Sequence, residues 1–220
     1  MCFSALVKQD LKLISQRFGA SVVRASFDDY EKMSEENPKK YKKMAEHPRI
    51  YPGYYAPLIL WEGGRRVIKP FRYRLRPHWA EKEIPSKYNL FNARLDALET
   101  RKSWQPLFMK QHGLLVFERF FEWVERDGKK TLISFAPDHE LMWAPCLWDS
   151  WSDGTETIHS FAMITTDPPP EISEMGHDRC PVFLKEELID TWLKAEGSKK
   201  KMYEVLNTLE PVHYRAADAA

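Results

Sequence analysis

Cysteine is scarce in this chain of 220 residues, which holds three, at positions 2, 146 and 180. Such an odd, sparse set argues against the disulfide framework of a small secreted domain. The first residues carry no basic leader and reach Lys8 and Asp10 too early for a signal peptide. We therefore expect a protein of a reducing, cytoplasmic compartment.

Long apolar runs, a charge of one sign and metal-ligand spacings are also lacking. No apolar stretch approaches the roughly 18 residues of a membrane span, so we expect none. The net charge is +1, so any site for a polyanion must be a local patch. The histidines and cysteines form no Cys-x-x-Cys or His-x-x-x-His pair, and no glycine-rich phosphate loop or Gly-x-Ser-x-Gly elbow occurs. We expect neither a metal nor another cofactor.

Core-forming residues, by contrast, are plentiful. Hydrophobic residues make up 43% of the chain and aromatic residues 13%, with eight Trp. A chain of this length can bury roughly 70–75% of its unfolded surface. Because no repeat, low-complexity segment or clear linker divides it, we expect one domain over residues 1–220.

Periodicity and turn residues predict strands in the middle of the chain and short helices around them. We expect helices over 10–18, 28–46 (split by Pro38), 185–194 and 198–209. Hairpins are expected around Gly63-Gly64 and around Asp127-Gly128, and a further strand over 158–165. The predicted fold class is α+β, with a largely antiparallel, barrel-like sheet as its core and short flanking helices.

Cys2 has a chemical option that no internal cysteine shares, although it could equally be an ordinary small residue. If Met1 is removed, Cys2 carries a thiol and a free α-amine with a pKa of about 7.7–8.0. Such a 1,2-aminothiol captures aldehydes, because the amine forms an imine and the thiol closes a five-membered thiazolidine. Cys2 is a candidate catalytic residue if the chain supplies partners for it.

Four polar residues are candidate partners. In the Asn-Ala-Arg segment, Asn92 could present an amide to a reacting group and Arg94 could clamp a phosphate, or the two could cap a turn and face solvent. Glu122, within an aromatic run, is either a partly buried acid suited to proton transfer or an outward-facing strand residue. His177, in a loop held by a nearby Gly and Pro, is an acid–base candidate or simply polar surface. Cys180 precedes an apolar segment and is expected to pack.

A local basic patch spans residues 65–76, where six cations interleave with aromatic residues. Because Arg72, Arg74 and Arg76 alternate, they would share one face of a strand. Trp79 follows them closely. Cations beside aromatic rings suit a groove for single-stranded nucleic acid, in which charge neutralises the backbone and bases stack. A solvated sheet face is the alternative interpretation.

Together these segments resemble the SRAP family, the SOS-response-associated peptidase domain that senses abasic sites in single-stranded DNA. The match is ordered from Met1-Cys2 to about residue 205. Residues 70–79 are similar to the family's Pro-x-Arg-Trp-Gly-Leu-x-Pro-x-Trp, 92–94 to its Asn-Ala-Arg, 121–123 to the end of its Gly-Phe-Tyr-Glu-Trp, and 164–184 to its Ile-Thr-Thr…His-x-Arg-Met-Pro-Val-x-Leu.

The resemblance implies a function. In that family the N-terminal Cys forms a thiazolidine crosslink with the ring-opened abasic sugar, after the protein has removed its own initiator Met. The resemblance implies Asn92, Glu122 and His177 as active-site partners of Cys2, and Arg94 as a phosphate contact. Glu122 would shuttle protons during imine formation, and His177 would assist opening of the sugar and later reversal.

Three departures mark the chain as a divergent member. Cys2-Phe3-Ser4 stands where the family has Cys-Gly-Arg, so Phe3 would crowd the approach to Cys2 and an expected DNA contact is lost. Residues 54–57 read Tyr-Tyr-Ala-Pro where the family often has Tyr-Asn-x-x-Pro, and Glu118-Arg119 replaces Asp-Gly. Either substrate detail or activity could have drifted.

The prediction is a monomeric enzyme that binds single-stranded DNA and captures abasic-site aldehydes through Cys2, in a bacterial cytoplasm and nucleoid or a eukaryotic nucleus. The residues expected to contact DNA are Arg72, Arg74, Arg76, Trp79 and Arg94. Two alternatives stay open. One is a plain cysteine peptidase that uses Cys2 and His177. The other is a non-catalytic DNA-binding module in which Phe3 has disabled the chemistry.

Overall fold

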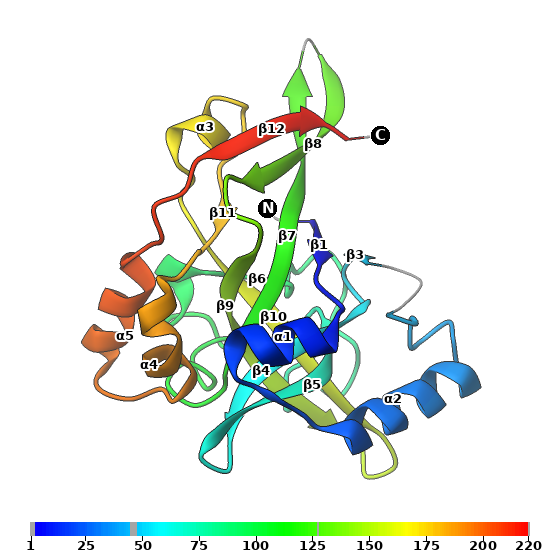
Figure 1. The fold of residues 1–220 in the computed structure, drawn as a ribbon. Helices are drawn as coiled ribbons and strands as arrows, with labels where there is room; N and C mark the ends of the chain where they lie inside the picture. Colours follow the sequence, from blue (N-terminus) through cyan, green and yellow to red (C-terminus); the bar gives the residue numbers. More distant parts are fainter. Residues whose placement is uncertain (1–2, 45–47, 127, 220) are drawn as a thin grey trace.

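The computed structural model describes residues 3–44, 48–126 and 128–219, and its strands form one continuous sheet (Figure 1). The strands are β1 Ser4–Val7, β2 Ser21–Val22, β3 Arg49–Ile50, β4 Tyr55–Glu62, β5 Arg65–Tyr73, β6 Asn92–Arg94, β7 His112–Arg126, β8 Lys129–Pro137, β9 Met142–Ser152, β10 Thr157–Thr166, β11 Cys180–Pro181 and β12 Tyr214–Asp218. The α-helices are α1 Leu11–Phe18, α2 Arg24–Glu36, α3 Pro170–Ser173, α4 Ile189–Leu193 and α5 Lys199–Asn207, and two 3-10 turns span Leu95–Ala97 and Glu186–Leu188.

Five of the strands close into a barrel. β4 pairs with β5, β5 with β10, β10 with β9, β9 with β7, and β7 with β4 again. The β5–β10 pairing is parallel and the other four are antiparallel. The remaining strands extend this sheet, and the helices lie around it (Figure 1). The predicted α+β class with a largely antiparallel, barrel-like core is confirmed.

Local turn chemistry sets the first hairpin of the barrel. Gly63 and Gly64 link β4 to β5 with φ angles of 57° and 77°. Two successive positive φ values are typical of the type I′ turn, whose twist matches that of paired strands and which glycine adopts without strain. The hairpin predicted at this position is confirmed. The second predicted hairpin joins β7 to β8, and its Asp127 lies outside the described residues.

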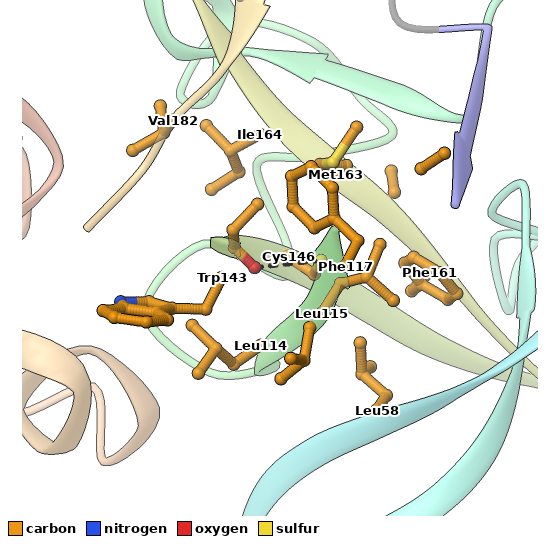
Figure 2. Close-up of a cluster of buried hydrophobic side chains, with 14 of the residues drawn as sticks. Leu58, Leu114, Leu115, Phe117, Trp143, Cys146, Phe161, Met163, Ile164 and Val182 are labelled. Carbon is orange, nitrogen blue, oxygen red and sulfur yellow. Dashed lines mark hydrogen bonds between the residues drawn. The ribbon is translucent and has the colours of Figure 1, made fainter. Parts of the chain in front are cut away.

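The barrel interior is filled by side chains from all of its strands. Leu58 of β4 pairs with Leu115 of β7, and Met163 of β10 pairs with Cys146 of β9; all four are fully buried. Figure 2 shows these side chains gathered with their neighbours in one cluster. Burying a side chain of this size contributes about 1.5–3 kcal/mol. Gly113 permits the close approach of β4, since a Cβ there would lie 2.7 Å from Leu58 Cδ2.

The N-terminal helices match the prediction in part. Asp10 caps α1 by accepting a hydrogen bond from the Leu13 N–H at 2.9 Å, and Ile14 and Phe18 are buried beneath it. The helix predicted over 28–46 instead spans Arg24–Glu36, and residues 37–44 are not helical. A residue that precedes proline avoids the helical region, and Asn37, before Pro38, has φ −141° and ψ 73°.

One feature of the topology determines where the site lies. β5 and β6 pair with the same strand, β10, one after the other: Arg72 is opposite Ser160, and Arg94 is opposite Thr165. Residues 74–91 leave the sheet between them as a loop. No helix in the described part of the chain is long and apolar enough to cross a membrane.

Candidate active site

Glu122 and His177 form a buried pair. Glu122 lies in β7, and His177 lies in the loop before β11. Glu122 Oε2 is 3.0 Å from His177 Nε2, and the two side chains are only 3% and 7% exposed. The interpretation of Glu122 as an outward-facing strand residue is therefore wrong, and so is that of His177 as polar surface. A carboxylate and an imidazole in contact away from water are suited to exchanging a proton.

The backbone of Arg179 fixes the orientation of the His177 ring. The Arg179 N–H donates to Nδ1 at 3.2 Å, so the neutral ring carries its proton on Nε2 and donates it to Glu122. When the ring is protonated on both nitrogens, Nδ1–H faces the Arg179 carbonyl oxygen at 2.8 Å. Both protonation states of His177 therefore have hydrogen-bond partners in place.

Asn92 is the first residue of β6 and is also buried. Its Oδ1 accepts a hydrogen bond from the Tyr73 hydroxyl at 3.3 Å, and its backbone N–H donates to Asn89 Oδ1 at 3.3 Å. Tyr73 is the last residue of β5, so the ends of two successive strands along β10 hold this carboxamide. The position is more constrained than that of a simple turn cap.

A pocket of about 420 Å³ opens beside Asn92. Two of its arginines already contact acids: Arg94 holds Asp96 through two hydrogen bonds of 2.9 and 2.5 Å, and Arg179 lies 2.7 Å from Asp167. His177 directly precedes Asp178 and Arg179 in the chain, so the loop that carries His177 also supplies part of the pocket wall. Its charged and polar lining suits an anionic ligand, and consists of Asn89, Asn92, Arg94, Arg101, Thr165, Asp178 and Arg179, with Trp104 beside them.

Strand β1 brings the N-terminal segment to this place. Cys2 lies outside the described residues. Ser4 pairs with Phe121, the neighbour of Glu122 in β7. Residues two positions apart in a chain are separated by at most about 7 Å, so covalent connection alone limits how far Cys2 can be from Ser4.

Phe3 is described, and its ring packs sideways. The ring lies edge-on to Tyr51 and Phe91, with centroid separations of 5.8 and 6.3 Å. Phe91 directly precedes Asn92. The predicted crowding residue therefore also attaches the start of the chain to the segment that carries Asn92.

Arg49 is a nearby residue that the sequence analysis missed. Its Nε donates to Ser4 Oγ at 3.1 Å, and its guanidinium carbon lies 3.7 Å from the centroid of the Phe121 ring. Ser4 stands where the family pattern has Arg, so a guanidinium from β3 occupies this neighbourhood instead. Arg49 comes close to Ser4 because β1 pairs with β3, and no local sequence motif predicts that pairing.

The basic patch lies away from Arg94 along the sheet. Arg72 is five residues along β10 from the level of Arg94, which corresponds to about 16 Å at 3.3 Å per residue. β5 ends at Tyr73, so the prediction that the three arginines share a strand face is wrong; Arg74 has a φ of 106°. All three, including Arg76, nevertheless reach one carboxylate, that of Glu83.

Trp79 is partly exposed, as a stacking residue would need to be. Its ring is 37% exposed, and Lys102 Nζ lies 4.2 Å from the ring centroid. Lys102 follows Arg101, which lines the pocket, so one face of this ring lies against the segment that forms the pocket wall.

The remaining thiol near the site is inert. Cys180 is buried, and burial raises the pKa of its thiol to about 12. Its Sγ lies 3.7 Å from the carbonyl oxygen of Asp167. Cys180 thus packs, as predicted. Within 3–44, 48–126 and 128–219, no group of three or more His, Cys, Asp or Glu side chains could hold a metal ion.

The fold and the site define a class of protein: a closed mixed β-barrel with a buried carboxylate–imidazole pair beside the start of the chain. The model of one family matches residues 1–219, that of SOS response associated peptidase (SRAP). The chain belongs to this family.

Comparisons with individual proteins agree with this family assignment. The abasic site processing protein YMR114C of Saccharomyces cerevisiae is 27% identical over 168 residues, covering 74% of this chain and 43% of its own. Abasic site processing protein HMCES of Pongo abelii is 25% identical over 184 residues (68% and 51%), and YoqW of Bacillus subtilis is 26% identical over 157 residues (69% and 69%). The chain thus spans about half the length of the first two relatives.

Two solved structures share the fold. A Bacteroides thetaiotaomicron protein has a TM-score of 0.75 at 19% identity, with 100% of this chain and 92% of that chain covered. A Bordetella bronchiseptica protein has a TM-score of 0.73 at 19% identity, with both chains covered fully.

Proposed function

We propose that this protein captures abasic sites in single-stranded DNA through Cys2, as a covalent thiazolidine, after Met1 has been removed. The observation that carries the proposal is the buried Glu122–His177 pair beside the start of β1, with Asn92 in the pocket that Asp178 and Arg179 also line. Membership of the SRAP family supports it, as do the three relatives, which are named abasic site processing proteins.

The chemistry needs only acid–base steps. An abasic deoxyribose opens to an aldehyde. The α-amine of Cys2 adds to the aldehyde carbon, and the resulting carbinolamine loses one water to give an imine. The thiol sulfur then adds to the imine carbon, the thiol proton passes to nitrogen, and the five-membered ring closes. One water leaves and nothing is oxidised or reduced.

The described residues fit roles in these steps. Glu122, in contact with His177 Nε2 at 3.0 Å, shuttles protons during imine formation and protonates the departing hydroxyl of the carbinolamine. His177 assists opening of the sugar through Glu122, which passes the proton of the imidazole to the sugar oxygen, so both contacts of the ring are kept. Asn92 has a fixed, buried carboxamide that positions the reacting sugar, and Arg94 at the pocket contacts a phosphate.

A plain cysteine peptidase with a Cys2–His177 dyad is supported less well. His177 Nε2 contacts Glu122, and Nδ1 contacts the backbone of Arg179. A thiol that used this ring as its base would have to displace one of these contacts.

The test is the intact mass of the protein after incubation with a single-stranded oligonucleotide that carries one abasic site. Processed wild-type protein should give an adduct that survives heat without reduction. Cys2→Ser keeps the amine but not the thiol, so it should give only a transient imine, trapped by borohydride. Protein that retains Met1 should give no adduct, because an amide nitrogen is not nucleophilic.

Two further variants complete the experiment. Cys180→Ser removes the buried thiol and should crosslink as wild type does. Phe3→Gly should speed capture if the ring limits access to Cys2. Equal crosslinking with and without Met1 would overturn the proposed chemistry, and binding without any crosslink would favour the non-catalytic module.

A further inference from the structure

The side chains of Arg72, Arg74 and Arg76 converge on Glu83, in the loop between β5 and β6. Arg72 donates hydrogen bonds to the carboxylate from both terminal nitrogens, Nη1 to Oε2 at 3.0 Å and Nη2 to Oε1 at 3.2 Å. Arg74 Nη1 lies 3.6 Å from Oε1, and Arg76 Nη1 lies 3.9 Å from Oε2. We call these four residues the arginine–Glu83 cluster.

The cluster has more positive charge than Glu83 can neutralise. Three guanidinium groups face one carboxylate, which leaves an excess of two positive charges. The arginine side chains are only 10–18% exposed, whereas Glu83 is 39% exposed. Burial lowers the pKa of Arg76; Glu83 and Asp153 oppose that shift and Arg72 adds to it. Excess like charge away from water is costly unless an anion compensates it.

Two donors in the cluster also lack acceptors. The Nε atoms of Arg72 and Arg76 are buried, and neither has a hydrogen-bond partner among the described residues. A buried donor without an acceptor costs about 1–3 kcal/mol. Arg76 is held in place by stacking on Trp151, with 3.1 Å between the guanidinium carbon and the ring centroid. Arg76 is thus held in place, and Glu83 leaves donors of the cluster without an acceptor.

We propose that the arginine–Glu83 cluster is a binding site for a phosphodiester group of single-stranded DNA, and that Glu83 is an internal competitor which occupies it when no DNA is bound. Carboxylate and phosphate present the same paired oxygens to a guanidinium fork, so one can replace the other.

The arginine–Glu83 cluster would contact the DNA strand at a distance from the nucleotide that reacts with Cys2. The cluster is about 16 Å along β10 from the level of Arg94, which is about five nucleotides at the stacked spacing of 3.4 Å per strand. This inference rests on the proposed function for its ligand. It assigns Glu83 the role of limiting affinity for undamaged strands.

The test compares Glu83→Gln with Glu81→Gln, which removes the same charge from the same loop but makes no ion pair among the described residues. Fluorescence anisotropy measures binding of an undamaged single-stranded oligonucleotide over a series of salt concentrations. Glu83→Gln should bind roughly fivefold tighter or more, as expected for removal of a competing ligand. Its log–log salt slope should be steeper by about 0.7, for one additional phosphate neutralised.

Inorganic phosphate is the second probe. Against chloride at equal ionic strength, phosphate should raise the melting temperature of Glu83→Gln more than that of wild type or Glu81→Gln. If Glu83→Gln does not fold, Arg74→Gln is measured in its place. Its log–log salt slope should be shallower than that of wild type. Equal binding by the two Glu variants, or an unchanged slope for Arg74→Gln, would overturn the proposal.

The outcome is independent of the capture chemistry. The oligonucleotide carries no abasic site, so Cys2 takes no part in its binding. A failure of the arginine–Glu83 cluster would leave adduct formation intact, and a failure of adduct formation would leave these affinities unchanged.

Discussion

Glu122 shows how one buried residue can be both structural and reactive. Its carboxylate is buried where β7 extends past the barrel to pair with β8, an unpaired charge there would be strongly destabilising, and His177 provides the contact that permits it. Removing one partner of a buried pair typically costs about 3–5 kcal/mol. Truncation of either residue would therefore confuse loss of folding with loss of chemistry, and isosteric replacement is the informative change.

Glu122→Gln keeps the size of the side chain, and its amide oxygen can still accept from His177 Nε2–H. It removes the proton acceptor, so crosslinking at saturating abasic DNA should slow by about 10²-fold or more while DNA affinity holds. Glu125→Gln, an exposed position on the same strand, is the matched control. A normally folded Glu122→Gln protein that crosslinks at the wild-type rate would assign Glu122 a purely structural role.

The candidate site was predictable only where a motif surrounds the residue. Asn92, Glu122 and His177 each stand in a short segment that resembles the SRAP pattern. Glu83 and Arg49 are single charged residues in unpatterned segments, and their importance comes from what folds against them. A lone glutamate in a loop carries no signal that three arginines will surround it.

At the scale of elements, the predictable strands are those joined by short turns. Gly63-Gly64 specifies the β4–β5 hairpin within a few residues. The parallel β5–β10 pairing and the succession of β5 and β6 along β10 join segments far apart in the chain, so no local pattern reports them. β9 was missed as well, because Pro145 interrupts a run that otherwise reads as a strand.

Arg74 marks the point where β5 gives way to the loop. Its φ of 106° lies where a side chain is strained, and the SRAP pattern has Gly at this position. Arg74 also donates to the carbonyl oxygen of Ile84, which helps to hold the loop.

Comparing Arg74→Gly with Arg74→Ala isolates this strain, because both lose the same contacts and only alanine keeps a Cβ. Arg74→Gly should be more stable by about 1 kcal/mol. Urea unfolding midpoints of the two variants provide the measurement. Equal midpoints would mean that the surrounding residues impose no strain on this backbone.

At the scale of the whole molecule, His112 joins the barrel to the C-terminal helices. Its Nδ1–H donates to the carbonyl oxygen of Trp192 in α4 at 2.6 Å, and its Nε2 accepts from the Met109 N–H at 3.1 Å. Its ring stacks on Trp192 at a centroid separation of 3.7 Å. Burial lowers the pKa of His112 to about 4, so the native protein holds this ring neutral.

Acidification should therefore weaken the fold. Between the ordinary histidine pKa of about 6.5 and a pH of about 4, His112 is protonated in the unfolded chain but stays neutral in the folded protein. Each pH unit in this window removes up to about 1.4 kcal/mol of stability. Burial also lowers the pKa of His159, which acts in the same direction.

His112→Phe removes this group while keeping a ring against Trp192. The variant should be less stable than wild type at pH 7.5, because two hydrogen bonds are lost. The difference in unfolding free energy should narrow by about 2 kcal/mol by pH 5, since only the unfolded wild-type chain is stabilised by protonation at this position. Urea unfolding from pH 5 to 7.5 measures the stability difference between the two proteins and its change with pH. His139→Gln, at a half-exposed position, is the control. A gap that does not change with pH would contradict the assignment.

The pairing of β1 with the middle of β7 has a consequence for the order of events during synthesis. The first strand leaves the ribosome early and can pair with β3 soon afterwards, yet it cannot join the central sheet until Phe121, the β7 partner of Ser4, has been made. The barrel cannot close until β10 has emerged, and His177 follows later still. The N-terminus is the oldest part of the nascent chain, and the groups proposed to activate it are among the youngest. Under the proposed function, the acid–base assistance of Glu122 and His177 would therefore reach Cys2 only when translation is nearly over.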